Sequence, residues 1–172
     1  MVANLSSHKK GWDDRWEEFS NWAEKGQKYK QELLELVDAD TRAFNGIMNA
    51  FSLPKGTEEE KAQRTAAIQH ATKVAIETPY RVMEVSLASM DVIRAMAQTG
   101  NPNSVSDAGV GALCARSAVM GAFMNVRINA GSFEDKAYVN DVLSRGREIE
   151  NKAIALETDI LKIVNEKIGN AG

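Results

Sequence analysis

The chain has 172 residues, the length of one ordinary domain, and its 21 basic and 24 acidic side chains give a net charge of −3. This balance offers no basic stripe of the kind that binds nucleic acid, and 44% hydrophobic with 26% charged residues is a globular composition. The single cysteine, Cys114, excludes an internal disulfide framework and favours a reducing, cytoplasmic setting. We expect Cys114 to be a small core residue between helices.

Helix signals begin near the N-terminus. Trp12, Trp16 and Phe19 recur at spacings of four and three, as on one face of an amphipathic helix, and Gly26 then interrupts the pattern. A longer helix follows from about residue 27 and ends in the turn at residues 53–56. Its predicted apolar stripe consists of Leu33, Val37, Asp40, Phe44, Ile47 and Phe51.

Three capping-box patterns predict the starts of further helices. They are Thr57 with Glu60, Ser104 with Asp107, and Ser132 with Asp135. Pro79 lies within the helix that begins after Thr57, and it either kinks that helix or starts a new one. About six helices with short connections and no convincing strand predict an all-α, single-domain bundle over residues 1–172.

The most apolar stretch, residues 109–126, is interrupted by Arg116 and is rich in glycine and alanine. A membrane-spanning helix needs about 20 predominantly apolar residues. We therefore interpret this stretch as a packed helix of the bundle and expect no membrane partner. Its small residues form a row in which another helix can come close: Gly111, Cys114, Ala118, Gly121 and Asn125.

One residue of the predicted apolar stripe is charged. Asp40 lies between Val37 and Phe44 on that stripe, whereas Asp38 lies about 200° away around the helix. A carboxylate on an apolar face is costly unless it is paired, hydrogen-bonded or functional. Desolvation would raise the pKa of Asp40 towards neutrality, as a general acid/base requires. The alternative is a structural aspartate held by an arginine or a helix terminus.

Polar residues also lie on the apolar helix that Ser104 opens. Asn125 and Asn129 are four residues apart on one face, and Asp107 lies in the first turn. For Asn125, either a structural hydrogen bond or a substrate contact explains an amide among small residues. For Asp107, completing a capping box is the simpler role. The two histidines, His8 and His70, have no metal-ligand spacing, so we expect no metal site.

Taken together, several short motifs resemble the cyclodeaminase/cyclohydrolase family, which includes the C-terminal domain of formimidoyltransferase-cyclodeaminase. The resemblance extends from residue 1 to about 165. In the first half it rests on residues 36–40 (Leu-Val-Asp-Ala-Asp), 43–44, 47–48, 53–55, 59–61 and 64. In the second half it rests on residues 100–101, 106–107, 121–122, 125–126 and 128–129.

The resemblance implies an all-helical homodimer with active sites near the subunit interface. It also implies the reaction, in which 5-formimidoyltetrahydrofolate closes to 5,10-methenyltetrahydrofolate and releases ammonia. Some members instead hydrolyse the methenyl compound. The second aspartate of the motif, here Asp40, is the implied catalytic residue. We expect Asp107, Asn125 and Asn129 to contact the folate, with no metal and no cofactor beyond this substrate.

Further expectations concern the partners and the first residues. Five basic residues are candidates for the carboxylates of a polyglutamylated folate: Lys9, Lys10, Lys55, Lys61 and Arg64. A separate formimidoyltransferase chain is an expected partner. Residues 1–5 resemble the end of the family's first Gly/Ala-rich helix, whose upstream part has no counterpart here. We therefore expect a truncated domain with an open groove near Asp40. The remaining alternatives are a methenyltetrahydrofolate cyclohydrolase and a catalytically impaired homodimer that retains only the scaffold.

Overall fold

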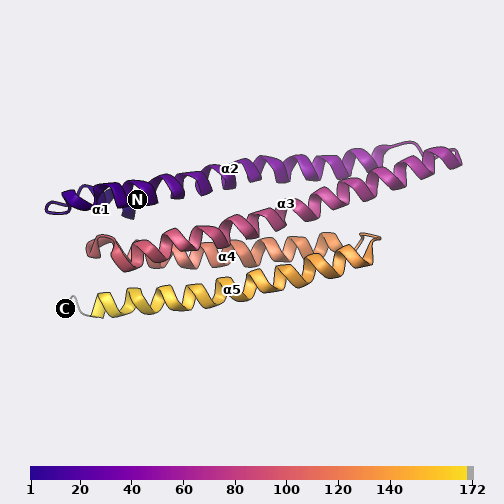
Figure 1. Cartoon of the computed structure of the whole chain (residues 1–172). Coiled ribbons are helices and arrows are strands. Elements are labelled where there is room, and N and C mark those ends of the chain that lie inside the picture. Colours follow the sequence, from indigo (N-terminus) through magenta and orange to yellow (C-terminus); the bar gives the residue numbers. More distant parts are fainter. Residues whose placement is uncertain (170–172) are drawn as a thin grey trace.

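A computed structural model describes residues 1–169, and these residues form five α-helices and two short 3₁₀ turns, with no strand (Figure 1). The prediction of an all-α fold is therefore confirmed. In chain order the elements are α1 (Val2–Ser7), η1 (Asp13–Arg15), α2 (Trp16–Ser52), α3 (Glu58–Thr99), η2 (Pro102–Ser104), α4 (Val105–Ala130) and α5 (Lys136–Gly169).

The four long helices form two antiparallel hairpins, α2 with α3 and α4 with α5. Helix α3 packs against α2, α4 and α5, whereas α2 packs mainly along α3. The turn between α2 and α3 lies beyond the turn between α4 and α5, so this end of the first hairpin projects as a two-helix arm (Figure 1). Helices α2 and α4 therefore flank α3 without a described helix between them.

The number of helices is smaller than the sequence predicts, because neither Gly26 nor Pro79 ends a helix. Trp16 and Phe19 belong to α2, which continues through Gly26 to Ser52. Helix α3 is continuous through Pro79. A glycine or proline costs a helix some free energy, but tertiary packing on both sides offsets that cost.

The first predicted capping box is confirmed at the start of α3. The backbone N–H of Glu60 donates to Thr57 Oγ1 at 3.2 Å, and the N–H of Thr57 donates to Glu60 Oε2 at 3.1 Å. The second predicted capping box is wrong, since the side chain of Ser104 makes no capping hydrogen bond to α4. Ser104 instead closes the preceding 3₁₀ turn, η2, so its backbone already lies in another helical element.

The third predicted capping box is also wrong. Its second residue, Asp135, precedes α5 directly and accepts the backbone N–H of Tyr138 at 3.0 Å. The serine predicted for the cap, Ser132, donates back to the carbonyl of Asn129 at 3.4 Å. The helix thus starts three residues later than a box opened by Ser132 would place it.

The main core lies between α3, α4 and α5. Its largest side chains with almost no exposure are Ile76, Met83, Met90, Val119, Phe123, Val126, Val142 and Ile160. Within the described residues, one stretch, Pro102–Ala130, is long and apolar enough to cross a bilayer by length and composition. In the structure its α4 part supplies one wall of this core, between α3 and α5.

The predicted apolar stripe of α2 is mostly not buried. Val37 and Phe44 are 63% and 61% exposed, and Phe51 is 51% exposed. The buried residues of α2 in its second half are small, Ala43 and Ala50, and α2 packs mainly along one long helix, α3. The larger apolar side chains therefore point away from the α2–α3 contact.

Cys114 is exposed, so the prediction of a core cysteine is wrong. Helix α4 buries the residues next to the predicted row, among them Ala112, Ala115 and Val119. Most of the row, including Ala118 and Gly121, lies on the open side of α4. The buried face of α4 combines alanines with Val119, Phe123 and Val126, whereas larger side chains such as Leu113 and Met124 are exposed together with the predicted row.

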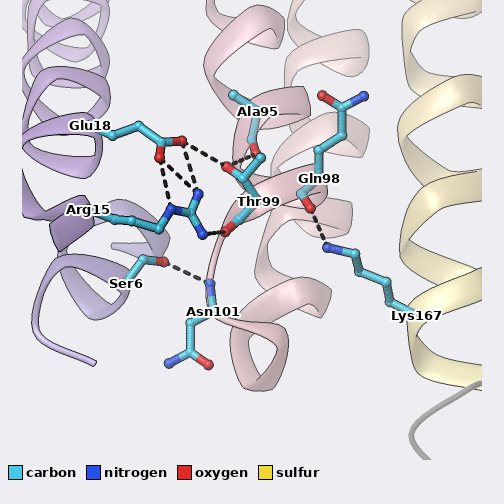
Figure 2. A network of polar contacts seen from close by, with 8 residues as sticks. All are labelled: Ser6, Arg15, Glu18, Ala95, Gln98, Thr99, Asn101 and Lys167. Carbon is cyan, nitrogen blue, oxygen red and sulfur yellow. Dashed lines mark hydrogen bonds and ion pairs between the residues drawn. The ribbon is translucent and has the colours of Figure 1, made fainter. Parts of the chain in front are cut away.

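Cations from two other helices meet the last carbonyl groups of α3 (Figure 2). The guanidinium of Arg15 pairs with Glu18 at 2.9 Å and also donates to the carbonyl of Thr99 at 3.5 Å. The ammonium of Lys167, near the end of α5, donates to the carbonyl of Gln98 at 2.6 Å. Positive groups at this position complement the partial negative charge of a helix C-terminus.

A buried hydroxyl joins α1 to the turn after α3 (Figure 2). Ser6 has no exposed surface, and its Oγ accepts the backbone N–H of Asn101 at 2.7 Å while donating to the carbonyl of Val2 at 2.7 Å. Val2 and Ala3 form a second small core with Phe19 and Met96. This contact places the first residues of the chain against the α3–α4 connection.

Candidate functional site

A pocket of about 370 Å³ opens between α2, α3 and α4 and contains two of the predicted site residues. Asp40 reaches it from α2, and Asn125 reaches it from α4. The structure therefore brings together residues that are far apart in the sequence. The other residues that line the pocket are Leu33, Leu36, Val37, Thr41, Pro79, Val82, Ala118 and Ala122.

The lining combines apolar walls with a small number of polar groups. Leu33, Leu36 and Val37 form the α2 wall, and Pro79 and Val82 come from α3. Sites for small organic molecules usually have this composition, in which apolar surface supplies contact and a few polar groups fix orientation. A flat heterocycle can lie against such walls while its substituents meet a carboxylate and an amide.

Asp40 is an exposed residue in the isolated chain, so the predicted burial of its carboxylate is wrong for this state. Within residues 1–169, neither an arginine nor a helix terminus holds this carboxylate, as a purely structural aspartate would require. The next residue, Thr41, turns its hydroxyl back to the carbonyl of Val37 at 3.2 Å. The carboxylate of Asp40 is thus available to a ligand in the pocket.

Asn125 and Asn129 have different surroundings although they lie one turn apart on α4. Asn125 is exposed and lines the pocket. Asn129 lies outside the pocket lining, and its Nδ2 donates to the carbonyl of Ala75 on α3 at 2.7 Å. The amide of Asn129 therefore already has a partner in the folded chain.

Asp107 lies at a different place. It is an exposed residue in the first turn of α4 and lines a smaller pocket of about 240 Å³ beside α1, with Met1 and Trp22. Within one chain, the structure does not bring Asp107 to the pocket of Asp40. The two predicted site residues Asp107 and Asn125, both on α4, therefore line different pockets.

The five basic residues proposed for a glutamate tail also lie away from the pocket lining. Lys61 pairs with Glu58 at 2.7 Å, and Arg64 donates to the carbonyl of Phe51 at 3.1 Å, both near the end of the two-helix arm. Lys55 lies in the turn between α2 and α3. Lys9 packs over the ring of Trp12 near the N-terminus, next to Lys10. None of them lines the pocket of Asp40.

Sequence reasoning missed most of the pocket walls. It treated Pro79 only as a helix irregularity, yet this buried residue faces the pocket. A proline in the middle of a long helix indicates an unusual site, because it removes a backbone hydrogen bond that neighbouring groups must replace. Leu36 and Ala122 belong to the motifs of the family resemblance, but their apolar side chains alone do not indicate a pocket wall, since apolar residues on a helix usually indicate the core.

Other features of the molecule lie outside this pocket. A larger groove of about 810 Å³ between α3 and α5 is lined by Tyr80 and Arg145 but by no predicted site residue. Burial and the nearby Glu77 raise the pKa of Tyr138 to about 12, and burial also raises the pKa of Tyr80. Among the residues that the structure describes, no group of three or more His, Cys, Asp or Glu side chains could hold a metal ion. The expectation of a reaction without metal stays a prediction.

Known proteins resemble this chain in both sequence and fold. The family described as "Formiminotransferase-cyclodeaminase" matches residues 1–148. The methenyltetrahydrofolate cyclohydrolase of Methylorubrum extorquens is 34% identical over 98% of this chain and 81% of that enzyme. The formimidoyltransferase-cyclodeaminase of Gallus gallus is 38% identical over 62% of this chain and 20% of that protein. The formiminotetrahydrofolate cyclodeaminase structure from Thermotoga maritima matches with a TM-score of 0.83 and 26% identity, over 98% of this chain and 80% of that one.

Proposed function

Because the chain belongs to the formiminotransferase-cyclodeaminase family of folate one-carbon enzymes, we propose that it cyclises 5-formimidoyltetrahydrofolate to 5,10-methenyltetrahydrofolate and releases ammonia. The observation that carries this proposal is the pocket in which Asp40 and Asn125 meet among apolar walls. The reaction needs one group that can accept and return a proton, and Asp40 is the ionisable residue in that lining.

In the proposed mechanism, N10 of the folate attacks the formimidoyl carbon in its amidinium form. The new C–N10 bond gives a tetrahedral carbon that carries N5, N10 and an amino group. Asp40 accepts the proton that N10 loses and returns it to the amino group. The C–N bond to that group then breaks, and ammonia leaves with the proton that came from N10. The carboxylate is thus restored without any other reactant.

Asn125 has a separate role in this proposal. Its amide offers both a donor and an acceptor, and it faces the pocket from α4 while Asp40 faces it from α2. We assign Asn125 to hold the formimidoyl group or the pterin, so that N10 approaches the carbon beside the carboxylate. Correct orientation of reacting groups lowers the barrier for ring closure.

A second candidate function is the hydrolysis of 5,10-methenyltetrahydrofolate to 10-formyltetrahydrofolate. It is favoured by the relative named methenyltetrahydrofolate cyclohydrolase, which matches 98% of this chain. The two reactions share a tetrahedral carbon between N5 and N10, and a hydroxyl replaces the amino group. In this case Asp40 would accept a proton from the attacking water and pass it to N5 as the C–N5 bond breaks, while the hydroxyl oxygen loses its remaining proton to solvent and becomes the formyl carbonyl.

The two reactions are distinguished by supplying each substrate to the purified protein. We expect ammonia to appear from 5-formimidoyltetrahydrofolate in proportion to the absorbance of the methenyl product. Hydrolysis of added methenyl compound without ammonia release would instead support the second candidate. If neither substrate reacts and no reduced folate binds, the impaired scaffold becomes the better account and both catalytic proposals fail.

The fused animal relatives suggest how the substrate is supplied. This chain covers 20% of the Gallus gallus and Rattus norvegicus proteins, whose names combine a formimidoyltransferase with a cyclodeaminase. We propose that a separate formimidoyltransferase provides 5-formimidoyltetrahydrofolate to this chain. Such a partner would deliver a folate whose N5 already carries the one-carbon unit.

We also propose that two copies of the chain form a homodimer through the open faces of α2 and α4. Large apolar side chains are exposed there, including Phe44 at 61%, Met124 at 61% and Ile128 at 76%. Monomeric proteins rarely leave contiguous apolar patches larger than a few hundred Å² exposed. Covering these faces would also remove the surroundings of Asp40 from bulk water.

The dimer proposal predicts a specific response to charge. Ile128→Glu should shift the protein from dimer to monomer in sedimentation equilibrium, because it places a carboxylate in the proposed contact. Ile168→Glu, at another exposed isoleucine near the end of α5, is the matched control and should leave the mass unchanged. A wild-type protein that sediments as a monomer at micromolar concentration would contradict the proposal.

A further inference from the structure

Pro79 creates an unusual requirement inside α3. Because proline has no backbone N–H, the carbonyl of Ala75, four residues earlier, loses its normal helical partner. Ala75 is 5% exposed and Pro79 is also buried, so this carbonyl lies where bulk water cannot easily replace the lost bond. Buried carbonyl groups in folded proteins are nearly always paired, so a partner from outside the helix is needed.

Asn129 on α4 supplies that partner. Its Nδ2 donates to the carbonyl oxygen of Ala75 at 2.7 Å. The surrounding contact between α3 and α4 contains many small apolar residues, such as Ala112 and Ala122. Contacts of this kind do not specify how far one helix slides along the other, whereas a directional hydrogen bond to one carbonyl does.

Both ends of this hydrogen bond lie one helical turn from the candidate site. Ala75 precedes Pro79 by four residues, and Asn129 follows Asn125 by four residues. Pro79 and Asn125 both line the pocket that contains Asp40. Any slide or rotation of α4 against α3 at this hydrogen bond therefore moves Asn125 relative to the α3 wall and to the carboxylate.

We infer that Asn129 is a positioning residue of the site: by pairing with the carbonyl that Pro79 leaves free, it fixes the place of Asn125 opposite Asp40. The role rests on the proposed function, because it concerns the geometry of that pocket. It replaces the expectation that Asn129 contacts the folate, since its amide is occupied by Ala75 and lies outside the lining. It also explains why a proline is accommodated in the middle of α3.

The test compares Asn129→Ala with a variant that weakens the same helix pair elsewhere. Gln69 on α3 is a suitable control: its Nε2 donates to the carbonyl of Ser132 at 3.4 Å, and its Oε1 accepts the N–H of Glu134 at 2.9 Å. Gln69→Ala thus removes hydrogen bonds between α3 and the turn after α4 without touching the pocket. Thermal unfolding of both variants measures how much each substitution lowers the stability of the fold.

The expected result is a decrease of kcat on the order of tenfold or more for Asn129→Ala, since small misplacements of reacting groups have large effects. Gln69→Ala should keep kcat within about twofold of the wild type, because it leaves the site in place. Equal values of kcat for Asn129→Ala and Gln69→Ala, at matched loss of stability, would overturn the inference.

A double-mutant cycle covers the case in which Asn129→Ala folds poorly. Pro79→Ala restores a backbone N–H, so the carbonyl of Ala75 regains a helical partner. In the Pro79→Ala background, Asn129→Ala should then lower stability and kcat by a smaller factor than in the wild-type background. Additive effects of the two substitutions would contradict the link through Ala75.

A spectroscopic measurement separates failure of this inference from failure of the proposed function. The side-chain amide signal of Asn125 in an NMR spectrum should shift in Asn129→Ala and stay in place in Gln69→Ala. An unchanged Asn125 signal in Asn129→Ala overturns the positioning role even if the enzyme is active. A protein that neither binds nor converts a reduced folate refutes the proposed function, while the shift still tests the positioning of Asn125.

Discussion

Replacing Asp40 with asparagine is expected to lower the rate of cyclisation by about 10²–10⁴-fold, because an amide cannot accept the N10 proton and return it to the amino group. The fold should remain intact, since the side chain is exposed and asparagine has nearly the same shape. Single-turnover formation of the methenyl product measures the chemical step, and circular dichroism with thermal unfolding measures the fold.

Asp38→Asn is the matched control for this substitution. Asp38 lies on the same helix, is also exposed, and is absent from the pocket lining. The same change of charge two residues earlier should leave turnover within about twofold of the wild type, because no proton is transferred there. Near-normal cyclisation by Asp40→Asn, or an equal loss in both variants, would refute the role of Asp40.

Gly146→Ala is expected to destabilise the protein by about 2–3 kcal/mol, because the core has no room for the added methyl group. A Cβ atom at position 146 of α5 would lie 2.5 Å from Cε2 and 2.9 Å from Cδ2 of Phe123. Phe123 is 1% exposed, so its ring cannot move towards solvent without opening the contact between α4 and α5. The midpoint of thermal unfolding should fall by roughly 4–12 °C.

Gly26→Ala separates the steric effect from the general effect of replacing a helical glycine. A Cβ atom at position 26 of α2 would meet only Val92 Cγ1, at 3.7 Å, which is an ordinary van der Waals contact. Alanine should therefore stabilise α2 by about 0.5–1 kcal/mol, since it loses less conformational entropy on folding than glycine. If Gly146→Ala also raised the unfolding midpoint, the tight contact with Phe123 would be refuted.

The elements of the fold were predictable to the extent that local chemistry decides them. The capping box of Thr57 and Glu60 was identified correctly, because both of its hydrogen bonds are made within four residues. The breaks expected at Gly26 and Pro79 were wrong, because contacts between distant helices outweigh local propensity there. Spacing alone also assigned Phe44 to the core, since it does not reveal that α2 packs mainly along one long helix, α3.

The candidate site was predictable as a set of residue types and less so as a place. The motif around Asp40 and the amide of Asn125 pointed to residues that line one pocket. Asp107 and Asn129 lie on the same helix as Asn125, yet the first is beside α1 and the second is bonded to Ala75. Which residues of a 26-residue helix share a site depends on where neighbouring helices cross it, and that information is not local.

The contact of Ser6 with Asn101 has a consequence for the order in which the molecule forms. The long helices pair with their neighbours in the chain, and the contacts next to the turns between them have low sequence separation, which favours early formation. The bond from Asn101 to Ser6 spans 95 positions, and α1 is a helix of six residues that is unstable alone. Helix α1 should therefore dock last and detach first. Each detachment releases the connection that leads into α4, so motion at the N-terminus reaches the helix that carries Asn125.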